Sequence, residues 1–350
     1  MLSQGSTCSE YLAGDQENSI GYSIYLRYLN EPVSLGGLKM KMKPFLFVMM
    51  MLPLVGEGYW SQCNAKEIRH PAVAGAFYPG SSNELRREVK AYLDSVPEIG
   101  PAGKIYAAVA PHAGYTYSGG VAAYTHKGLS TVDFQTLIII GHDTHQNAVA
   151  FTCPADYFQT PLGKVPVDRE MMAKMHALNG GIKDSWALHA RDHTVEVHLP
   201  FLQVLGRSCK IIPILFGNPT GKNCQILANA IIRAAGSKRI FVLASADMSH
   251  YPPYDLAYKV DKSTLEVLKS LDVERLFTHL TAQEKGSSVP NLRTALCAKG
   301  GVGTAVLFAR AHGAESAQIL RYANSGDVPG GDKRGVVGYS SVLFVKKAAP

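Results

Sequence analysis

The sequence predicts an α/β protein whose central sheet is covered by helices on both faces, and three observations lead to this fold class. Short apolar runs, typical of strands, alternate with segments of helical periodicity. The runs contain few polar residues, as strands do when both faces of their sheet are buried. The polar motifs directly follow the apolar runs, where α/β proteins place their sites.

Two of the expected helices have clear start signals. Residues 81–96 show apolar residues at helical spacing, and Ser81 and Glu84 fit a capping box. Residues 167–178 carry Asp168 and Glu170 in the first turn, where the helix dipole favours negative charge. Further helices are expected at 222–235, 256–271 and 303–311, and strands at 105–110, 136–140, 210–216, 239–244, 318–322 and 336–345.

The chain of 350 residues is expected to form a single domain over residues 66–350, after an N-terminal extension over residues 1–65. Within this extension, residues 40–63 combine two lysines, an apolar run and a polar end, which is the layout of a secretory signal peptide. If translation starts at Met40 or Met42, we expect an exported protein, periplasmic or lipid-anchored through Cys63. Otherwise we expect a cytoplasmic protein, with the apolar run as a helix on the domain.

Composition argues against two classes of partner. The formal net charge is +7, but the basic residues are scattered, so nucleic-acid binding is not expected. No apolar run reaches the roughly 18 residues that span a bilayer, so an integral membrane span is not expected. Six cysteines occur without CxxC spacing, and most are interpreted as buried small apolar residues.

Two histidine motifs follow predicted strands. His112 lies just after residues 105–110, beside Gly114, and is either a ligand or a hydrogen-bonded loop residue. His142 and His145 follow residues 136–140, and the intervening Asp143 could orient one of them as a ligand. The alternative for this second motif is a turn with solvated histidines.

A third motif contains acids beside histidine. His193 and Glu196 are three residues apart, and Asp192 and Glu196 are four apart. If a helix begins here, each pair lies on one face and could serve acid–base chemistry or support a metal. The spacing is not that of the HExxH zinc motif. The alternative is a helix N-terminus with solvated charges.

The last candidates are Asp247 and His250, after residues 239–244, and Cys297. Cys297 precedes a glycine-rich helix start, where the helix dipole and Lys299 would favour the thiolate; the alternative is a buried, inert cysteine. Two histidines with one anionic ligand suit non-haem Fe(II), and a thiolate also accepts copper or zinc.

These motifs, in this order, resemble those of the Memo-like family, whose bacterial members are known as AmmeMemoRadiSam system protein B. The resemblance covers residues 69–345 and rests on residues 70–79, 110–115, 160–163, 168–170, 192–201, 245–251, 296–297, 321–327 and 336–339. Several motifs in a common order are far more specific than any one of them.

The resemblance implies the fold of class III extradiol dioxygenases, a three-layer α/β/α sandwich around a central mixed sheet. It implies a metal-binding protein, with iron or copper as the metal, and association with AMMECR1-type and radical-SAM proteins. His112 and Cys297 match the family's ligands, and Asp247 and His250 match its pocket residues.

One position departs from the family pattern, because Thr144 stands where the second ligand histidine is usual. We expect His145 to replace it, with His142 as the alternative. The expected metal ligands are therefore His112, His145 and Cys297, holding Fe(II) or else copper or zinc. His193, Asp247 and His250 are the expected catalytic residues that move protons.

Three functions are compatible with this reading of the sequence. The first is a metal-dependent oxygenase or redox enzyme of the non-haem iron dioxygenase type. The second is a non-catalytic protein that binds metal or a peptide. The third is a hydrolase with Cys297 as nucleophile and His250 as base.

Overall fold

The structure is a computed structural model that describes residues 67–98, 103–178, 180–286 and 288–346. These residues belong to one compact unit of the chain. The signal-peptide prediction for residues 40–63 lies outside the described residues. None of the described helices combines the length and apolarity needed to cross a membrane.

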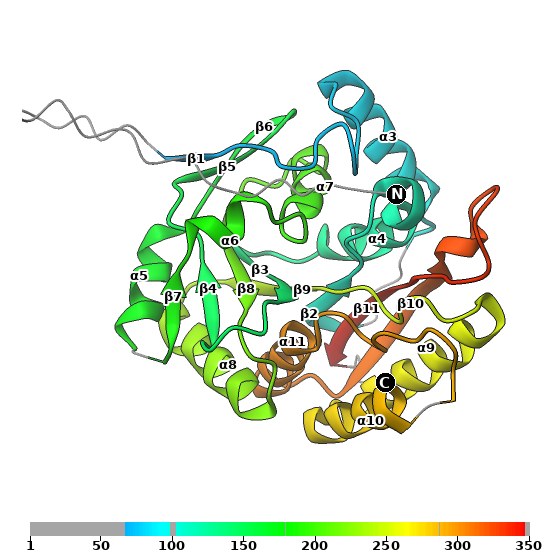
Figure 1. Ribbon diagram of the computed structural model, residues 1–350. Helices are drawn as coiled ribbons and strands as arrows, with labels where there is room; N and C mark the ends of the chain where they lie inside the picture. Colours follow the sequence, from blue (N-terminus) through cyan, green and yellow to red (C-terminus); the bar gives the residue numbers. More distant parts are fainter. Residues whose placement is uncertain (1–66, 99–102, 179, 287, 347–350) are drawn as a thin grey trace, which may run out of the picture. The chain divides into compact units, whose positions relative to one another are not determined.

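An eight-stranded mixed sheet forms the centre of this unit (Figure 1). Its four inner strands β2, β9, β3 and β8 are parallel to one another, and antiparallel pairings add β11 beside β2 and β4 beside β8. In spatial order the strands are β10 (Ser316–Asn324), β11 (Gly338–Lys346), β2 (Lys104–Ala110), β9 (Ile240–Ser245), β3 (Thr136–Asp143), β8 (Lys210–Phe216), β4 (Ala150–Thr152) and β7 (Ile182–Asp184).

Helices cover both faces of this sheet and produce the three-layer α/β/α sandwich that was predicted. They pack against one another in two groups (Figure 1). One group contains α3 (Ser82–Ser95), α4 (Tyr115–Leu129) and α7 (Leu199–Val204), and the other contains α5 (Arg169–Ala177), α8 (Gly221–Ala235), α9 (Tyr254–Leu268), α10 (Val273–Gly286) and α11 (Lys299–Ala311).

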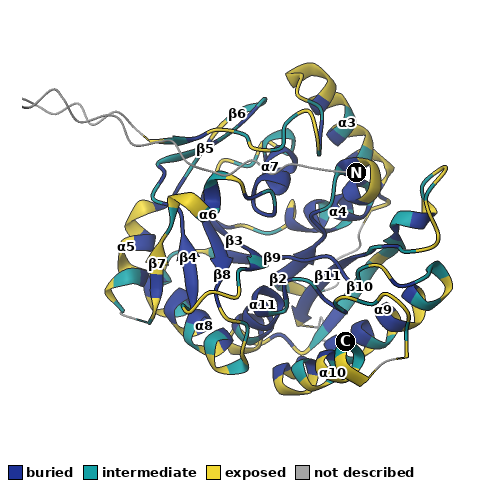
Figure 2. Ribbon diagram, viewed as in Figure 1, coloured by how far each residue is buried: buried dark blue, intermediate teal, exposed yellow. Residues whose placement is uncertain are grey.

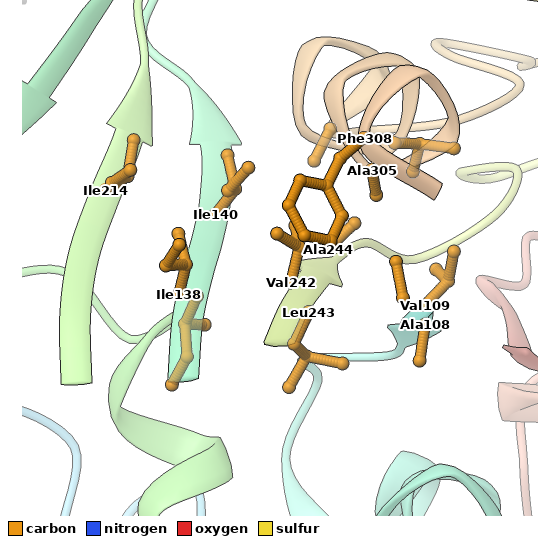
Figure 3. Close-up of a cluster of buried hydrophobic side chains, with 14 of the residues drawn as sticks. Ala108, Val109, Ile138, Ile140, Ile214, Val242, Leu243, Ala244, Ala305 and Phe308 are labelled. Atoms are coloured by element: carbon orange, nitrogen blue, oxygen red, sulfur yellow. The ribbon is translucent and has the colours of Figure 1, made fainter. Parts of the chain in front are cut away.

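The inner strands are buried on both faces, which explains their nearly continuous apolar sequences. Figure 3 shows that Val242 and Ala244 of β9 point toward Phe308 of α11, whereas Leu243 points away from it. All four side chains are buried. In Figure 2 the inner strands of the sheet are mostly buried, while the outer helix faces are exposed. Side chains that alternate across the sheet thus fill both helix–sheet interfaces.

A small three-stranded sheet accompanies the central one. It contains β1 (Ile68–Arg69), β5 (Tyr157–Thr160) and β6 (Gly163–Pro166). The remaining short elements are α6 (Trp186–Ala190) and the 3₁₀ turns at Glu196–His198 and Ser325–Asp327.

All the predicted strands and helices exist, but two details of the helix predictions are wrong. Ser81 is the N-cap of α3, yet its side chain makes no capping hydrogen bond, so the predicted capping box is absent. Helix α11 begins at Lys299, before the predicted residue 303. It starts early because Asp143, at the end of β3, accepts a hydrogen bond from the backbone N–H of Gly300 at 3.2 Å.

Helix α4 was not predicted, since Gly119 and Gly120 weaken the helical pattern. The structure gives a packing reason for one of these glycines. A Cβ atom on Gly119 would lie 2.7 Å from Cε2 of Tyr92, so only glycine lets α4 approach α3 this closely. A Cβ atom on Gly120 would lie 3.9 Å from the same ring.

Candidate functional site

The candidate site lies at the carboxyl ends of β2, β9 and β3. His112 follows β2, Asp247 follows β9, and His142 is the second-last residue of β3. Cys297 precedes α11, which packs against these three strands. Parallel strands bring their carboxyl ends to one edge of a sheet, so residues distant in the chain become neighbours there.

His112, Cys297 and Asp247 are in mutual contact. Nε2 of His112 lies 3.4 Å from Sγ of Cys297. The backbone N–H of Asp247 donates to Sγ at 3.2 Å, and the backbone N–H of Cys297 donates to the Asp247 carbonyl at 3.1 Å. The Asp247 carboxylate accepts a hydrogen bond from the backbone N–H of His112 at 2.8 Å. These bonds fix the loops after β2 and β9 and the start of α11 relative to one another.

Burial disfavours the charged form of each of these three groups. It lowers the pKa of the His112 imidazole to about 4 and raises the pKa of the Asp247 carboxyl to about 6. Burial, followed by the charge of Asp247, also raises the pKa of the Cys297 thiol well above its ordinary value.

The expectation that Lys299 and the helix dipole would favour the Cys297 thiolate is therefore wrong for the protein without metal. Nζ of Lys299 is paired with the Glu284 carboxylate at 3.2 Å, so its charge is partly neutralised. Burial then has the larger effect on the thiol.

The other two predicted catalytic residues lie close to this cluster. The ring centroid of His193 is 5.5 Å from that of His112 in an edge-on arrangement, and Phe77 contacts its other side. Burial lowers the pKa of His193 to about 4. In the described part of the chain, the buried Nε2 of His250 has no hydrogen-bond partner. Burial lowers the pKa of His250, and the charge of Asp247 partly opposes this shift.

A carboxylate holds the imidazole of His142, as was predicted for this motif, but it belongs to Asp192 and not to Asp143. Nδ1 of His142 lies 3.2 Å from Oδ1 of Asp192, and this bond raises the pKa of His142. Asp143 instead binds the start of α11. The Asp192 carboxylate is buried and also accepts backbone hydrogen bonds from Thr194 and Val195, so it holds a fixed position.

His145, the predicted second ligand, is exposed and has a left-handed backbone with φ of 56°. Its backbone N–H donates to the Gly217 carbonyl at 3.0 Å. In the described part of the chain, no hydrogen bond or ion pair joins its imidazole to His112 or Cys297. Within the same residues, no group of three or more His, Cys, Asp and Glu side chains is arranged to hold a metal ion. The role of His145 stays a prediction.

The expected pairing of His193 with Glu196 does not occur. The buried Glu196 carboxylate forms an ion pair with Arg69 and accepts hydrogen bonds from the Tyr78 hydroxyl and from the backbone N–H of Ala72 at 2.7 Å. No continuous helix runs from Asp192, so the two side chains do not share a helical face. Glu196 therefore joins the N-terminal segment of the described chain to the domain.

Three buried residues behind His112 were missed from the sequence. Ser245 contacts His112, His198 contacts Ser245, and His126 contacts His198. Ser245 directly follows a predicted strand and His198 lies within the third motif, so the sequence placed both near candidate site residues. Nothing in the sequence pointed to His126, because it lies in the unpredicted helix α4.

An open cavity of about 680 Å³ lies next to His250. His112 and Cys297 do not line it, so it is separate from their contact. Its lining residues are Tyr251, Asn291, Leu292, Arg293, Asp332, Arg334 and Gly335.

The fold and the site define an α/β protein with a histidine, cysteine and carboxylate cluster at the strand ends. The family described as Memo-like protein matches residues 69–343. A MEMO1 family protein of Nitrosopumilus maritimus is 33% identical over 287 residues, which cover 79% of this chain and 100% of the relative. A MEMO1 family protein of Sulfolobus acidocaldarius is 35% identical over 294 residues, which cover 79% of this chain and 99% of the relative. The chain belongs to the Memo-like family, as the sequence motifs predicted.

A solved structure of an uncharacterized Escherichia coli K12 protein is a more distant match. It has a TM-score of 0.45 and 12% identity, and covers 69% of this chain and 100% of its own.

Proposed function

We propose that this chain is a metal-binding protein that holds Fe(II), or else copper or zinc, through His112, Cys297 and a third histidine. The contact of 3.4 Å between Nε2 of His112 and Sγ of Cys297 carries the proposal. An imidazole nitrogen and a sulfur meet there from strand ends far apart in the chain. This donor set suits all three metals.

The chemistry of the surrounding residues fits a bound cation. Among the described residues, the buried Nε2 of His250 beside the cluster has no hydrogen-bond partner, and the Asp247 carboxylate lies 3.8 Å from Nε2 of His112. An unpartnered buried nitrogen has a desolvation cost that a ligand or a bound water would remove.

We assign the third ligand to His142 rather than His145. The Asp192 carboxylate binds Nδ1 of His142, which leaves Nε2 as the available donor, and an imidazole held in this way is typical of metal ligands. His145 has no such support. Because the described residues contain no preformed set of three ligands, metal binding would include a movement of the end of β3, which carries His142.

Redox or oxygenase activity is the catalytic form of this proposal. A bound Fe(II) would supply the redox centre. Asp247 within the cluster, and His193 and His250 beside it, are groups of this chain that could hold or move a proton. Oxygen uptake by the iron-loaded protein with small catechol-like compounds tests this form, and metal binding without uptake supports the non-catalytic form.

The contact between Cys297 and His112 also supports a second candidate, a thiol hydrolase in which His112, not His250, would be the base. The raised pKa of the thiol speaks against it, because the thiolate is the nucleophilic form. The variant Cys297→Ser separates the two functions. Loss of bound metal supports the metal protein, whereas retained metal with lost turnover supports the hydrolase.

Titration with Co²⁺ tests the donor set directly. A thiolate ligand gives a sulfur-to-cobalt charge-transfer absorption, which we expect in the parent and not in Cys297→Ser. Cys209→Ser is the matched control, since Cys209 is also a free cysteine but lies apart from the cluster. A charge-transfer band that survives in Cys297→Ser would overturn the proposed ligand set. Association with AMMECR1-type or radical-SAM proteins remains a proposal for pull-down experiments with those partners.

A further inference from the structure

A row of four buried side chains leads from His112 into the protein. Nδ1 of His112 lies 2.9 Å from Oγ of Ser245, which in turn lies 2.9 Å from Nε2 of His198. Nδ1 of His198 lies 3.1 Å from Nε2 of His126. The four residues come from the loop after β2, from β9, from the 3₁₀ turn before α7 and from α4. All are at most 5% exposed, so solvent does not satisfy these groups.

The geometry fixes the direction of each hydrogen bond. The hydroxyl of Ser245 has a single hydrogen, and its Oγ lies 2.6 Å from the carbonyl oxygen of Thr194, which can only accept. Ser245 therefore donates to Thr194. Both imidazoles that contact Ser245 must then donate to its oxygen, so His112 carries its proton on Nδ1 and His198 carries its proton on Nε2.

This assignment determines what His112 presents to the site. With the proton on Nδ1, the free lone pair is on Nε2, the atom that faces Sγ of Cys297. A ligand or a base needs this lone pair, and the hydrogen bond at the other ring nitrogen selects the tautomer.

Packing alone does not account for the row, because the row leaves a polar group unsatisfied. Nδ1 of His126 is buried and has no hydrogen-bond partner in the described part of the protein, although its ring stacks on Phe201. A buried polar atom without a partner destabilises the fold, and apolar side chains would fill the same space without that cost.

We propose that Ser245, supported by His198, is a positioning residue that holds His112 in the Nδ1-protonated tautomer with Nε2 directed at Cys297. The effect on metal affinity rests on the proposed function, whereas the tautomer itself does not.

The test compares Ser245→Ala and Ser245→Thr in the full chain. Nitrogen-15 NMR of labelled histidine distinguishes protonated from unprotonated ring nitrogens, and His112 is assigned by its loss in His112→Ala. We expect the Nδ1-protonated form in the parent and in Ser245→Thr, and a mixture or the Nε2-protonated form in Ser245→Ala. We also expect Zn²⁺ affinity to fall about 10- to 100-fold in Ser245→Ala.

Ser341→Ala is the matched control, because Ser341 is a buried serine on β11 that contacts Thr125 and not the row. It should leave the tautomer and the affinity unchanged. If Ser245→Ala does not fold, Ser245→Cys offers a side chain of similar shape but a much weaker acceptor and carries the same test.

An unchanged His112 tautomer in Ser245→Ala or Ser245→Cys overturns the proposal. A changed tautomer in a protein whose parent binds no Zn²⁺, Fe²⁺ or Co²⁺ supports the positioning role and overturns the proposed function. The two claims are therefore separable in one set of samples.

Discussion

His112 and Cys297 are 185 positions apart in the chain, yet Nε2 of the first lies 3.4 Å from Sγ of the second. His112 lies after the end of β2 and Cys297 lies before the start of α11, so both are at the same edge of the sheet. A separation of more than about 10 Å would have excluded a shared ion, since zinc binds these donors at about 2.0–2.3 Å. The observed contact satisfies this first condition for a common ligand set.

The choice between His142 and His145 leads to the first prediction. His142→Gln keeps an N–H donor for Asp192 but removes the imidazole, and it should weaken Zn²⁺ binding by at least about 10-fold. His145→Asn is the matched variant, because asparagine tolerates the positive φ of this position, and it should leave the affinity unchanged. Competition with a chromophoric chelator measures both affinities. The reverse pattern would restore His145 as the ligand.

The buried ion pair of Arg69 and Glu196 predicts a large effect on stability. Both side chains are at most 1% exposed, so Arg69→Met would leave the Glu196 carboxylate buried without its counter-charge. The free energy of unfolding should fall by about 3–5 kcal/mol, as measured by urea denaturation.

An exposed pair provides the comparison for this variant. Lys90 and Asp94 lie on the surface of α3 with their charged atoms 2.6 Å apart. Lys90→Met should change the free energy of unfolding by less than about 1 kcal/mol. Equal losses in the two variants would show that Arg69 does not stabilise the fold through this pair.

Two adjacent glycines of α4 predict opposite effects. Gly119→Ala would push a methyl group against the Tyr92 ring. This ring is held in place because its hydroxyl lies 3.0 Å from both the Glu88 carboxylate and the Tyr115 carbonyl, either of which can accept its hydrogen. Gly119→Ala should destabilise the protein by about 1–3 kcal/mol. Gly120→Ala has room and should stabilise it by about 0.5–1 kcal/mol. Thermal unfolding of the two variants measures the difference, and a stabilising Gly119→Ala would refute the packing argument.

Burial of His126 predicts a pH dependence of stability. Its pKa falls from 6.5 to about 3 in the folded protein, since burial disfavours the imidazolium. Between these values the unfolded chain binds a proton that the folded protein does not. Between these two pKa values, the contribution of His126 lowers the free energy of unfolding by about 1.4 kcal/mol for each unit that the pH falls.

The variant His126→Gln tests this linkage, because glutamine does not titrate and retains an N–H donor for His198. Urea denaturation at pH 4 to 6 should give a slope that is shallower by about 1.4 kcal/mol per pH unit than in the parent. Identical slopes would mean that His126 is protonated in the folded protein.

The sequence predicted the layers and the strands because buried strands leave a continuous apolar pattern. It missed α4, because glycine has a low helix propensity. The close contact between α4 and Tyr92 that requires Gly119 exists only in the folded structure. Ser81 lies at the N-cap of α3, as its sequence position suggested, but its side chain makes no capping hydrogen bond.

The site was predictable to a similar degree. Strand ends pointed to His112 and Asp247, and the family resemblance pointed to Cys297 as a candidate ligand. The partner of His142 was not predictable, because Asp192 reaches it from 50 positions away. The row from Ser245 to His126 depends on side chains from four separate segments, and no spacing along the chain records that.

The metal content of the protein is the most direct test of the proposed function. The full chain, purified without oxygen and supplied with Fe²⁺, should contain about one metal ion per chain by elemental analysis. His112→Ala and Cys297→Ser should contain little or none, and Cys209→Ser should match the parent. A parent that binds no metal, or a His112→Ala variant that binds as much as the parent, would contradict the assignment of His112 and Cys297 as ligands of one ion.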